Sequence, residues 1–139
     1  MILPLYNIPE PQPDYFQHLT TQQEILMRVN DYRKQEGLEQ LRLSSDLSKA
    51  AVIRVKEIAQ SFSHTRPDGS TAKSLLNPEP KYLGENLLEA NVLNPKLYVK
   101  AWMNSKSHRD NLFSSMFLNA GIAIRKINGN YYVVMILTD

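Results

Sequence analysis

The strongest constraint on the fold lies near the carboxyl end of the chain. Two segments rich in β-branched and apolar residues, 121–127 and 131–137, flank Asn128-Gly129. Asn-Gly between two such segments is the strongest short signal for a β-hairpin. Every residue of 131–137 is apolar or aromatic, so both faces of that strand should be covered. We therefore predict an α/β (α+β) fold, a three-layer α-β-α sandwich with a central antiparallel sheet.

The first helix is expected to begin near Thr20 or Thr21. Thr21 and Glu24 have the spacing of a capping box, and an apolar stripe follows them. Gly37 is expected to end this helix, because glycine is common just past a helix end. Residues 38–43 then read as a packed connection.

A second helix over residues 47–62 has the clearest helical periodicity. Positions 47, 50, 51, 54, 55, 58, 59 and 62 fall on one face, and seven of these eight residues are apolar. Ser44 or Ser45 can cap its start. We predict a core helix, with these residues facing the core: Leu47, Ala50, Ala51, Val55, Ile58, Ala59 and Phe62.

The middle of the chain contains shorter elements. Pro67-Asp68-Gly69 is a turn signal, because proline presets φ and glycine accepts a positive φ. Asn94-Pro95 is a typical helix opening. The expected elements are a short helix from about 70 to 76, a strand or tight bend at 83–88, a helix from 94 to about 104–107, and a further turn at 108–112.

Composition excludes several classes of function. The chain has no cysteine, so disulfides, thiolate zinc sites and a cysteine nucleophile are ruled out. Its net charge of +2 comes from 16 basic and 14 acidic residues that are interspersed, which makes nucleic acid an unexpected partner. No apolar stretch approaches the roughly 18–20 residues that a membrane-spanning helix needs, so we expect no transmembrane segment.

The first 19 residues are expected to form a proline-rich extended arm or linker, with the folded domain over residues 20–139. Four of the eight prolines fall in residues 1–13, and such density disfavours both helix and strand pairing. The arm could be a spacer that follows a removed signal or anchor. Alternatively, Tyr6, Tyr15 and Phe16 could pin it across the folded body.

Three titratable residues stand at expected turn positions: His64, Glu85 and His108. Two imidazoles and a carboxylate are a common ligand set for zinc or another divalent metal. They are 21 and 23 residues apart in the sequence, so spacing alone does not bring them together. Each also has a simpler interpretation, since the histidines could be surface turn residues and Glu85 could bind a backbone donor.

The sequence resembles the CAP superfamily, the SCP-like or cysteine-rich secretory, antigen 5 and pathogenesis-related domains, and is most similar to its short, cysteine-free bacterial members. The resemblance covers residue 21 to the end. Five segments carry it in the order typical of the family: residues 30–33, 62–64 with 68–69, 84–86, 102–111 and 121–122.

The resemblance implies a central cleft that contains His64, His108 and Glu85. The family's second acid usually stands three residues after the tryptophan, and Ser105 occupies that position here. A catalytic scheme that needs two carboxylates is therefore in doubt, and no catalytic residue is assigned. Two imidazoles could still hold zinc or another divalent metal, with Glu85 as a third ligand. Structural support is expected from Asn86, Asn111 and Trp102.

Cysteine-free members of the family are typically secreted or attached to the cell surface, and we expect the same localisation here. The expected function is a non-catalytic, monomeric binding module for a lipid, glycan or peptide, without a required cofactor. The alternative is a metal-dependent hydrolase of peptide or cell-wall substrates, with Glu85 as base or ligand. In a third interpretation the role is structural: Glu85, Asn86 and Asn111 satisfy backbone donors and so tie the fold together.

Overall fold

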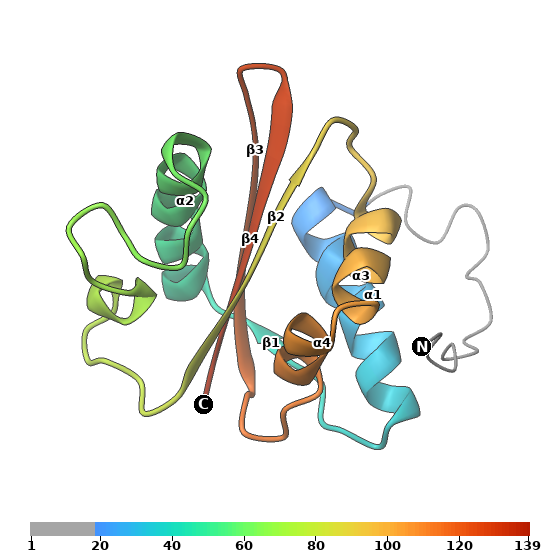
Figure 1. Cartoon of the computed structure of the whole chain (residues 1–139). Coiled ribbons are helices and arrows are strands. Elements are labelled where there is room, and N and C mark those ends of the chain that lie inside the picture. Colours follow the sequence, from blue (N-terminus) through green and yellow to red (C-terminus); the bar gives the residue numbers. More distant parts are fainter. Residues whose placement is uncertain (1–18) are drawn as a thin grey trace.

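The computed structural model describes residues 19–139, and the expected arm at residues 1–19 lies outside this range except for Leu19. Helices cover both faces of a sheet, with α2 on one side and α1, α3 and α4 on the other (Figure 1). This confirms the three-layer sandwich. The elements, in chain order, are α1 (Thr21–Gln35), β1 (Arg42–Leu43), α2 (Ser45–Gln60), the 3-10 helix η1 (Ala72–Leu75), β2 (Leu83–Ala90), α3 (Pro95–Met103), α4 (Lys106–Leu112), β3 (Asn119–Ile127) and β4 (Asn130–Thr138).

The sheet has the strand order β1-β3-β4-β2. β4 pairs antiparallel with β2 and β3, as predicted, whereas β1 pairs parallel with β3 through Arg42↔Asn119 and Leu43↔Ala120. The expectation of a packed connection over residues 38–43 therefore missed a strand. A strand of two residues is too short to show the alternation by which strands are recognised.

The hairpin is confirmed, and its turn has the geometry that the Asn-Gly pair predicts. Asn128 and Gly129 both have positive φ, 51° and 86°, as the two central residues of a type I′ turn require. β4 lies in the interior of the sheet and is buried from Tyr132 to Thr138. Val133 packs in the core on the α1 side and Val134 in the core on the α2 side, which explains why the strand is apolar at successive positions.

Two details of the helices differ from the sequence predictions. The capping box of α1 lies one residue earlier than expected: Thr20 Oγ1 accepts from Gln23 N at 3.1 Å, and Gln23 Oε1 accepts from Thr20 N at 2.9 Å. α2 is capped by Ser44 as predicted, but ends at Gln60. Phe62 is consequently outside the helix and 53% exposed, so its assignment to the core was wrong.

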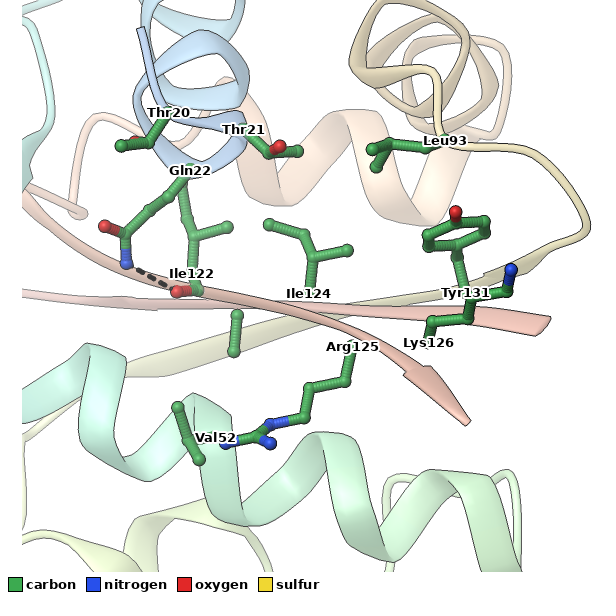
Figure 2. Close-up of a pocket in the computed structure, with 11 residues that line it drawn as sticks. Thr20, Thr21, Gln22, Val52, Leu93, Ile122, Ile124, Arg125, Lys126 and Tyr131 are labelled. Carbon is green, nitrogen blue, oxygen red and sulfur yellow. Dashed lines mark hydrogen bonds between the residues drawn. The ribbon is translucent and has the colours of Figure 1, made fainter. Parts of the chain in front are cut away.

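One side of β3 is an edge of the sheet for most of its length, because β1 pairs with it only as far as Ala120. At Ile122 this edge is satisfied by side chains from both helical layers. Ser48 Oγ accepts from Ile122 N at 3.3 Å, and Gln22 Nε2 donates to Ile122 O at 2.6 Å (Figure 2). The helices thus protect a part of the edge that no strand of residues 19–139 covers.

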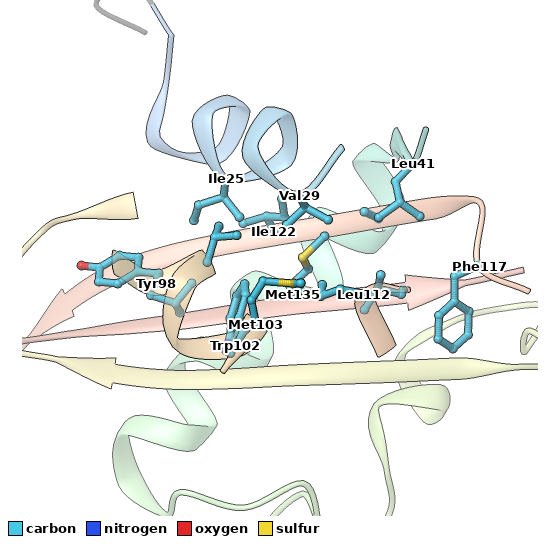
Figure 3. Packing of buried hydrophobic residues seen from close by; sticks show 14 residues of the cluster. Ile25, Val29, Leu41, Tyr98, Trp102, Met103, Leu112, Phe117, Ile122 and Met135 are labelled. Carbon is cyan, nitrogen blue, oxygen red and sulfur yellow. The ribbon is translucent and has the colours of Figure 1, made fainter. Parts of the chain in front are cut away.

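The sheet separates two hydrophobic cores. The larger lies beneath α1, α3 and α4, with Trp102 and Met103 in its middle, Ile25 and Val29 above them, and Leu112 farther along the sheet (Figure 3). The smaller lies between α2 and the other face of the sheet. No helix within residues 19–139 is both long and apolar enough to cross a bilayer.

A buried arginine joins α1 to the segment that leads into β3. Arg33 is fully buried and donates to Glu39 O at 2.7 Å, to Leu112 O at 2.8 Å and to Phe117 O at 3.1 Å. Carbonyl groups in loops and at the carboxyl ends of helices need such donors when they are buried. This part of the resemblance segment at residues 30–33 therefore has a structural role.

We expect Gly121→Ala to destabilise the fold by about 1–3 kcal/mol or more, as overpacking does. A Cβ at Gly121 would lie 2.1 Å from the carbonyl carbon of Leu47, so α2 would have to move away from β3. The control is Gly37→Ala, where a Cβ meets nothing within 4 Å and only the φ of 71° opposes it. Urea denaturation should show a larger loss for Gly121→Ala, and equal losses would contradict the close contact.

Candidate functional site

A hollow of about 340 Å³ lies beside the start of β2. Its lining includes His64, from the loop after α2, Glu85, from β2, and Asn111, from α4. Thr71 and Lys73 lie at η1 on the same hollow. Residues from four separate elements therefore meet there, including two of the three candidates that the sequence predicts.

The Glu85 carboxylate is held between an arginine and a histidine. Its Oε2 accepts from Arg54 Nε at 2.8 Å, and its Oε1 accepts from Arg54 Nη2 at 3.2 Å. His64 Nδ1 lies 2.8 Å from Glu85 Oε1 and must donate there, because an ionised carboxylate only accepts. The side chain of Glu85 is 5% exposed, that of Arg54 is fully buried and that of His64 is 63% exposed.

Arg54 is a site residue that the sequence analysis missed. It is the one non-apolar residue among the eight positions of the core-facing stripe of α2. A charged residue on such a stripe is rarely buried without a partner, so this exception was the available signal. Burial opposes the charge of Arg54, but its hydrogen bonds to Glu85 and Glu57 outweigh burial and raise the pKa of the guanidinium.

A chain of ion pairs fixes the loop that carries His64. Glu57 Oε1 accepts from Arg54 Nη1 at 2.9 Å, and Glu57 Oε2 accepts from Arg66 Nη2 at 3.0 Å. Arg54 Nη2 also donates to Ser63 O at 2.5 Å. Burial raises the pKa of Glu57, but hydrogen bonds from Arg66 and Arg54 outweigh this effect and lower it. The backbone of Ser63 and the side chain of Arg66, on either side of His64, are thereby tied to α2.

His108 lies in α4, near the other two candidates. Its Nδ1 forms a 2.8 Å hydrogen bond with Ser105 Oγ. Burial lowers the pKa of His108, and the positive charge of His64 lowers it further. Asn86 Nδ2 donates to His108 O at 3.1 Å, so the residue next to Glu85 positions α4. His108 and Ser105 are not among the lining residues of the 340 Å³ hollow.

The three expected support residues all make hydrogen bonds between elements. Asn111 Nδ2 donates to Asn86 Oδ1 at 2.9 Å, which links α4 to β2. Trp102 Nε1 donates to Leu87 O at 3.0 Å, which links α3 to the same strand. Asn86 and Trp102 are 0% and 1% exposed, so these bonds satisfy groups that water does not reach.

The described residues contain no group of three or more His, Asp or Glu side chains arranged to hold a metal ion. The donor atoms that remain are the Nε2 atoms of His64 and His108, since Nδ1 of each ring is engaged with Glu85 or Ser105. When Nδ1 donates its proton, the ring lone pair lies on Nε2. Each ring thus keeps one nitrogen that could bind a metal, and Glu85 orients the ring of His64.

We expect Arg54→Met to destabilise the protein by about 3–5 kcal/mol, since loss of one partner leaves a buried charge uncompensated. The matched control is Lys56→Met on the same helix, where the side chain is exposed and the effect should be within about 0.5 kcal/mol. Urea denaturation at pH 7 measures both. Equal stability of the two variants would contradict the proposed importance of the Arg54–Glu85 pair.

We expect NMR titration to give His108 a pKa below the ordinary imidazole value of about 6.5. The His64→Gln substitution should raise the pKa of His108, because it removes the like positive charge of His64 while the burial of His108 remains. With this lowered pKa, the His108 imidazole takes up its proton at a higher pH in the unfolded chain than in the folded chain. The stability that His108 contributes is therefore present above about pH 6.5 and is lost as the pH falls through its folded-state pKa. A pKa at or above the ordinary value would contradict this.

Comparison with known proteins gives the family of the chain. The model of "CAP: Cysteine-rich secretory protein family" matches residues 26–137. The uncharacterized protein YkwD of Bacillus subtilis is 27% identical over 106 residues, which are 73% of this chain and 41% of that protein.

Solved structures share the fold. An extracellular protein of Bacillus anthracis that contains an SCP domain is similar with a TM-score of 0.76 and 21% identity, covering 94% of this chain and 45% of that one. An outer surface protein of Borrelia burgdorferi is similar with a TM-score of 0.75 and 20% identity, covering 87% of this chain and 96% of that one. The chain thus spans less than half the length of the Bacillus proteins. With the family match over most of its length, it belongs to the CAP, or cysteine-rich secretory protein, family.

Proposed function

We propose that this chain is a non-catalytic binding module that acts outside the cell and binds its ligand at the hollow beside His64 and Glu85. One observation carries the proposal: Glu85, the acidic residue among the described lining residues, is engaged by Arg54 and His64. A general base must be within reach of a substrate proton and able to accept it. A carboxylate held by a buried arginine is poorly suited to that role.

The residue at position 105, where the family usually has its second acid, also supports a non-catalytic role. Ser105 stands three residues after Trp102, and its hydroxyl forms a hydrogen bond with His108. A hydroxyl orients the ring but adds no negative charge. The part of the site that residues 19–139 form therefore does not offer the pair of carboxylates that acid–base hydrolysis would use.

The size of the hollow favours a small ligand group over a long acyl chain. The hollow of about 340 Å³ is at the small end of ligand sites. Thr71, Lys73 and His64 are among its lining residues, beside the apolar Ala72 and Leu83. Of the ligands that the family resemblance suggests, part of a glycan or peptide fits these groups better than a lipid tail.

The two histidines also fit a divalent metal. In metal sites, a histidine commonly gives its second ring proton to a carboxylate or another acceptor, which fixes the ring. His64 has this arrangement with Glu85, and His108 has a comparable one with Ser105. Nε2 of each ring would be the ligand atom, and a bound cation would attract an oxygen of the ligand. Glu85 then acts as a positioning residue.

Localisation outside the cell rests on the relatives. One similar structure is described as an extracellular protein and another as an outer surface protein. The absence of cysteine suits either side of a membrane. We propose secretion or surface attachment for this chain, as expected from its family.

Zinc titration by calorimetry tests the role of the histidines. We expect His64→Ala/His108→Ala to lose at least about tenfold in affinity, because both imidazole donors are gone. The control is His18→Ala, the third histidine of the chain. Affinity of the native protein should fall as the pH drops through about 6.5, since protons compete for the same nitrogens. An unchanged zinc affinity in the double variant, or a zinc affinity that does not vary between about pH 5 and 8, would contradict the proposal that the two histidines bind the metal.

A hydrolysis assay separates binding from catalysis. Zinc-loaded protein is incubated with peptidoglycan and with a peptide library, beside the Glu85→Gln variant. We expect neither the native protein nor the variant to release products from either substrate, because Glu85 is held by Arg54. Hydrolysis that is abolished both by a chelator and by Glu85→Gln would establish the metal-dependent hydrolase instead.

A further inference from the structure

A second hollow lies along the free edge of β3, on a different part of the surface from His64 and Glu85. Its volume is about 620 Å³, and it is bordered by the start of α1, by Val52 of α2, by the segment from Ile122 to Lys126 and by Leu93 before α3 (Figure 2). None of its lining residues lines the hollow beside β2. Its chemistry is therefore independent of the histidines.

The backbone of β3 presents unused hydrogen-bonding groups to this hollow. Residue pairs closest to a two-residue turn are hydrogen-bonded, so Ile127 and the odd-numbered residues before it bond to β4. The even-numbered residues face the opposite edge. Ala120 O accepts from Ser44 N there, and Ile122 bonds to Ser48 and Gln22. Next along this edge are Ile124 and Lys126, whose backbone N–H and C=O groups have no partner within residues 19–139.

Side chains on the two faces of this edge differ in character. Ile124 points toward the α1 side, where Leu93 lies and is 47% exposed, whereas Arg125 points toward α2 and Val52 (Figure 2). An added strand would place alternate side chains on these two faces. One set would meet Ile124 and Leu93, and the other would meet Arg125.

The charge along this edge is positive. Arg125 and Lys126 are exposed, and no acidic residue is among the described lining residues. A second copy that paired antiparallel about a two-fold axis, with Ile124 opposite Lys126 so that both residues are used, would place Arg125 opposite Arg125, which is unfavourable. Charge complementarity therefore favours a different partner, one that carries acidic residues.

We propose that the β3 edge at Ile124–Lys126 binds an extended peptide segment of another protein, in which apolar and acidic residues alternate, as an added strand. The peptide backbone would bond to Ile124 and Lys126. Its apolar side chains would pack on Ile124 and Leu93, and its acidic side chains would face Arg125. Strand addition of this kind obtains affinity from backbone bonds and specificity from alternate side chains.

NMR titration of the ¹⁵N-labelled full chain tests the proposal, with the peptide acetyl-Thr-Val-Glu-Val-Glu-Val-Thr-amide as probe. We expect shifts of the backbone amides of Ile124 and Lys126, and slower hydrogen exchange of both once they are paired. A probe with proline at its central valine should fail to bind, since proline lacks the donor and disrupts the strand. The His64→Ala/His108→Ala variant should bind the probe as the native chain does.

Charge reversal tests the specificity. Arg125→Glu should weaken binding of the acidic probe by about tenfold and strengthen binding of the same peptide with lysine in place of glutamate, because cross-strand charges attract or repel. Lys100→Glu is the matched control, since this exposed residue on α3 gives the same change in net charge and should leave both affinities unchanged.

Several results would overturn the proposal. These are no binding of the acidic probe, equal binding of the proline probe, or shifts confined to the region of His64. Shifts at Ile124 that depend on protein concentration without peptide would instead identify a second copy as the occupant. Nuclear Overhauser contacts from residues 1–18 to this edge would identify the chain's own amino-terminal segment.

Discussion

The buried ion pair between Arg54 and Glu85 is the interaction on which the site depends. It joins α2 to β2, and through Glu57 and Ser63 it also fixes the loop that carries His64. Burying two charges has a large desolvation cost, which close geometry and additional hydrogen bonds offset. Arg54 uses Glu85, Glu57 and Ser63 as partners, so its charge is well satisfied. The pair therefore determines where His64 lies and how its ring is turned.

The same pair limits the chemistry of the site. A carboxylate that neutralises a buried guanidinium and orients an imidazole is committed to structure, and Ser105 brings no second acid. What remains available are two ring nitrogens and a small hollow of mixed lining. These groups suit recognition of a polar ligand or a cation. The free edge of β3 provides a separate surface whose backbone groups and positive charge suit an extended chain, so the domain has two distinct surfaces for binding.

Much of the fold could be predicted because its signals are local. The Asn128-Gly129 turn, the apolar second strand and the periodic face of α2 each identify their element from a few neighbouring residues. The errors have equally local causes. β1 has two residues and shows no pattern, the capping box of α1 had two adjacent threonines to choose from, and the periodicity of α2 extended to Phe62 after the helix had ended.

The sequence by itself determined the types of the main elements, the burial of β4 and the family, because periodicity and turn chemistry act over short stretches of chain. It named His64, Glu85 and His108 as candidates through their residue types and the family resemblance. Only the tertiary structure decided that Arg54, 31 residues before Glu85, neutralises that carboxylate, and that no strand within residues 19–139 pairs with the β3 edge beyond Ala120. Contacts between residues so far apart depend on how the layers pack, and local patterns do not encode that packing.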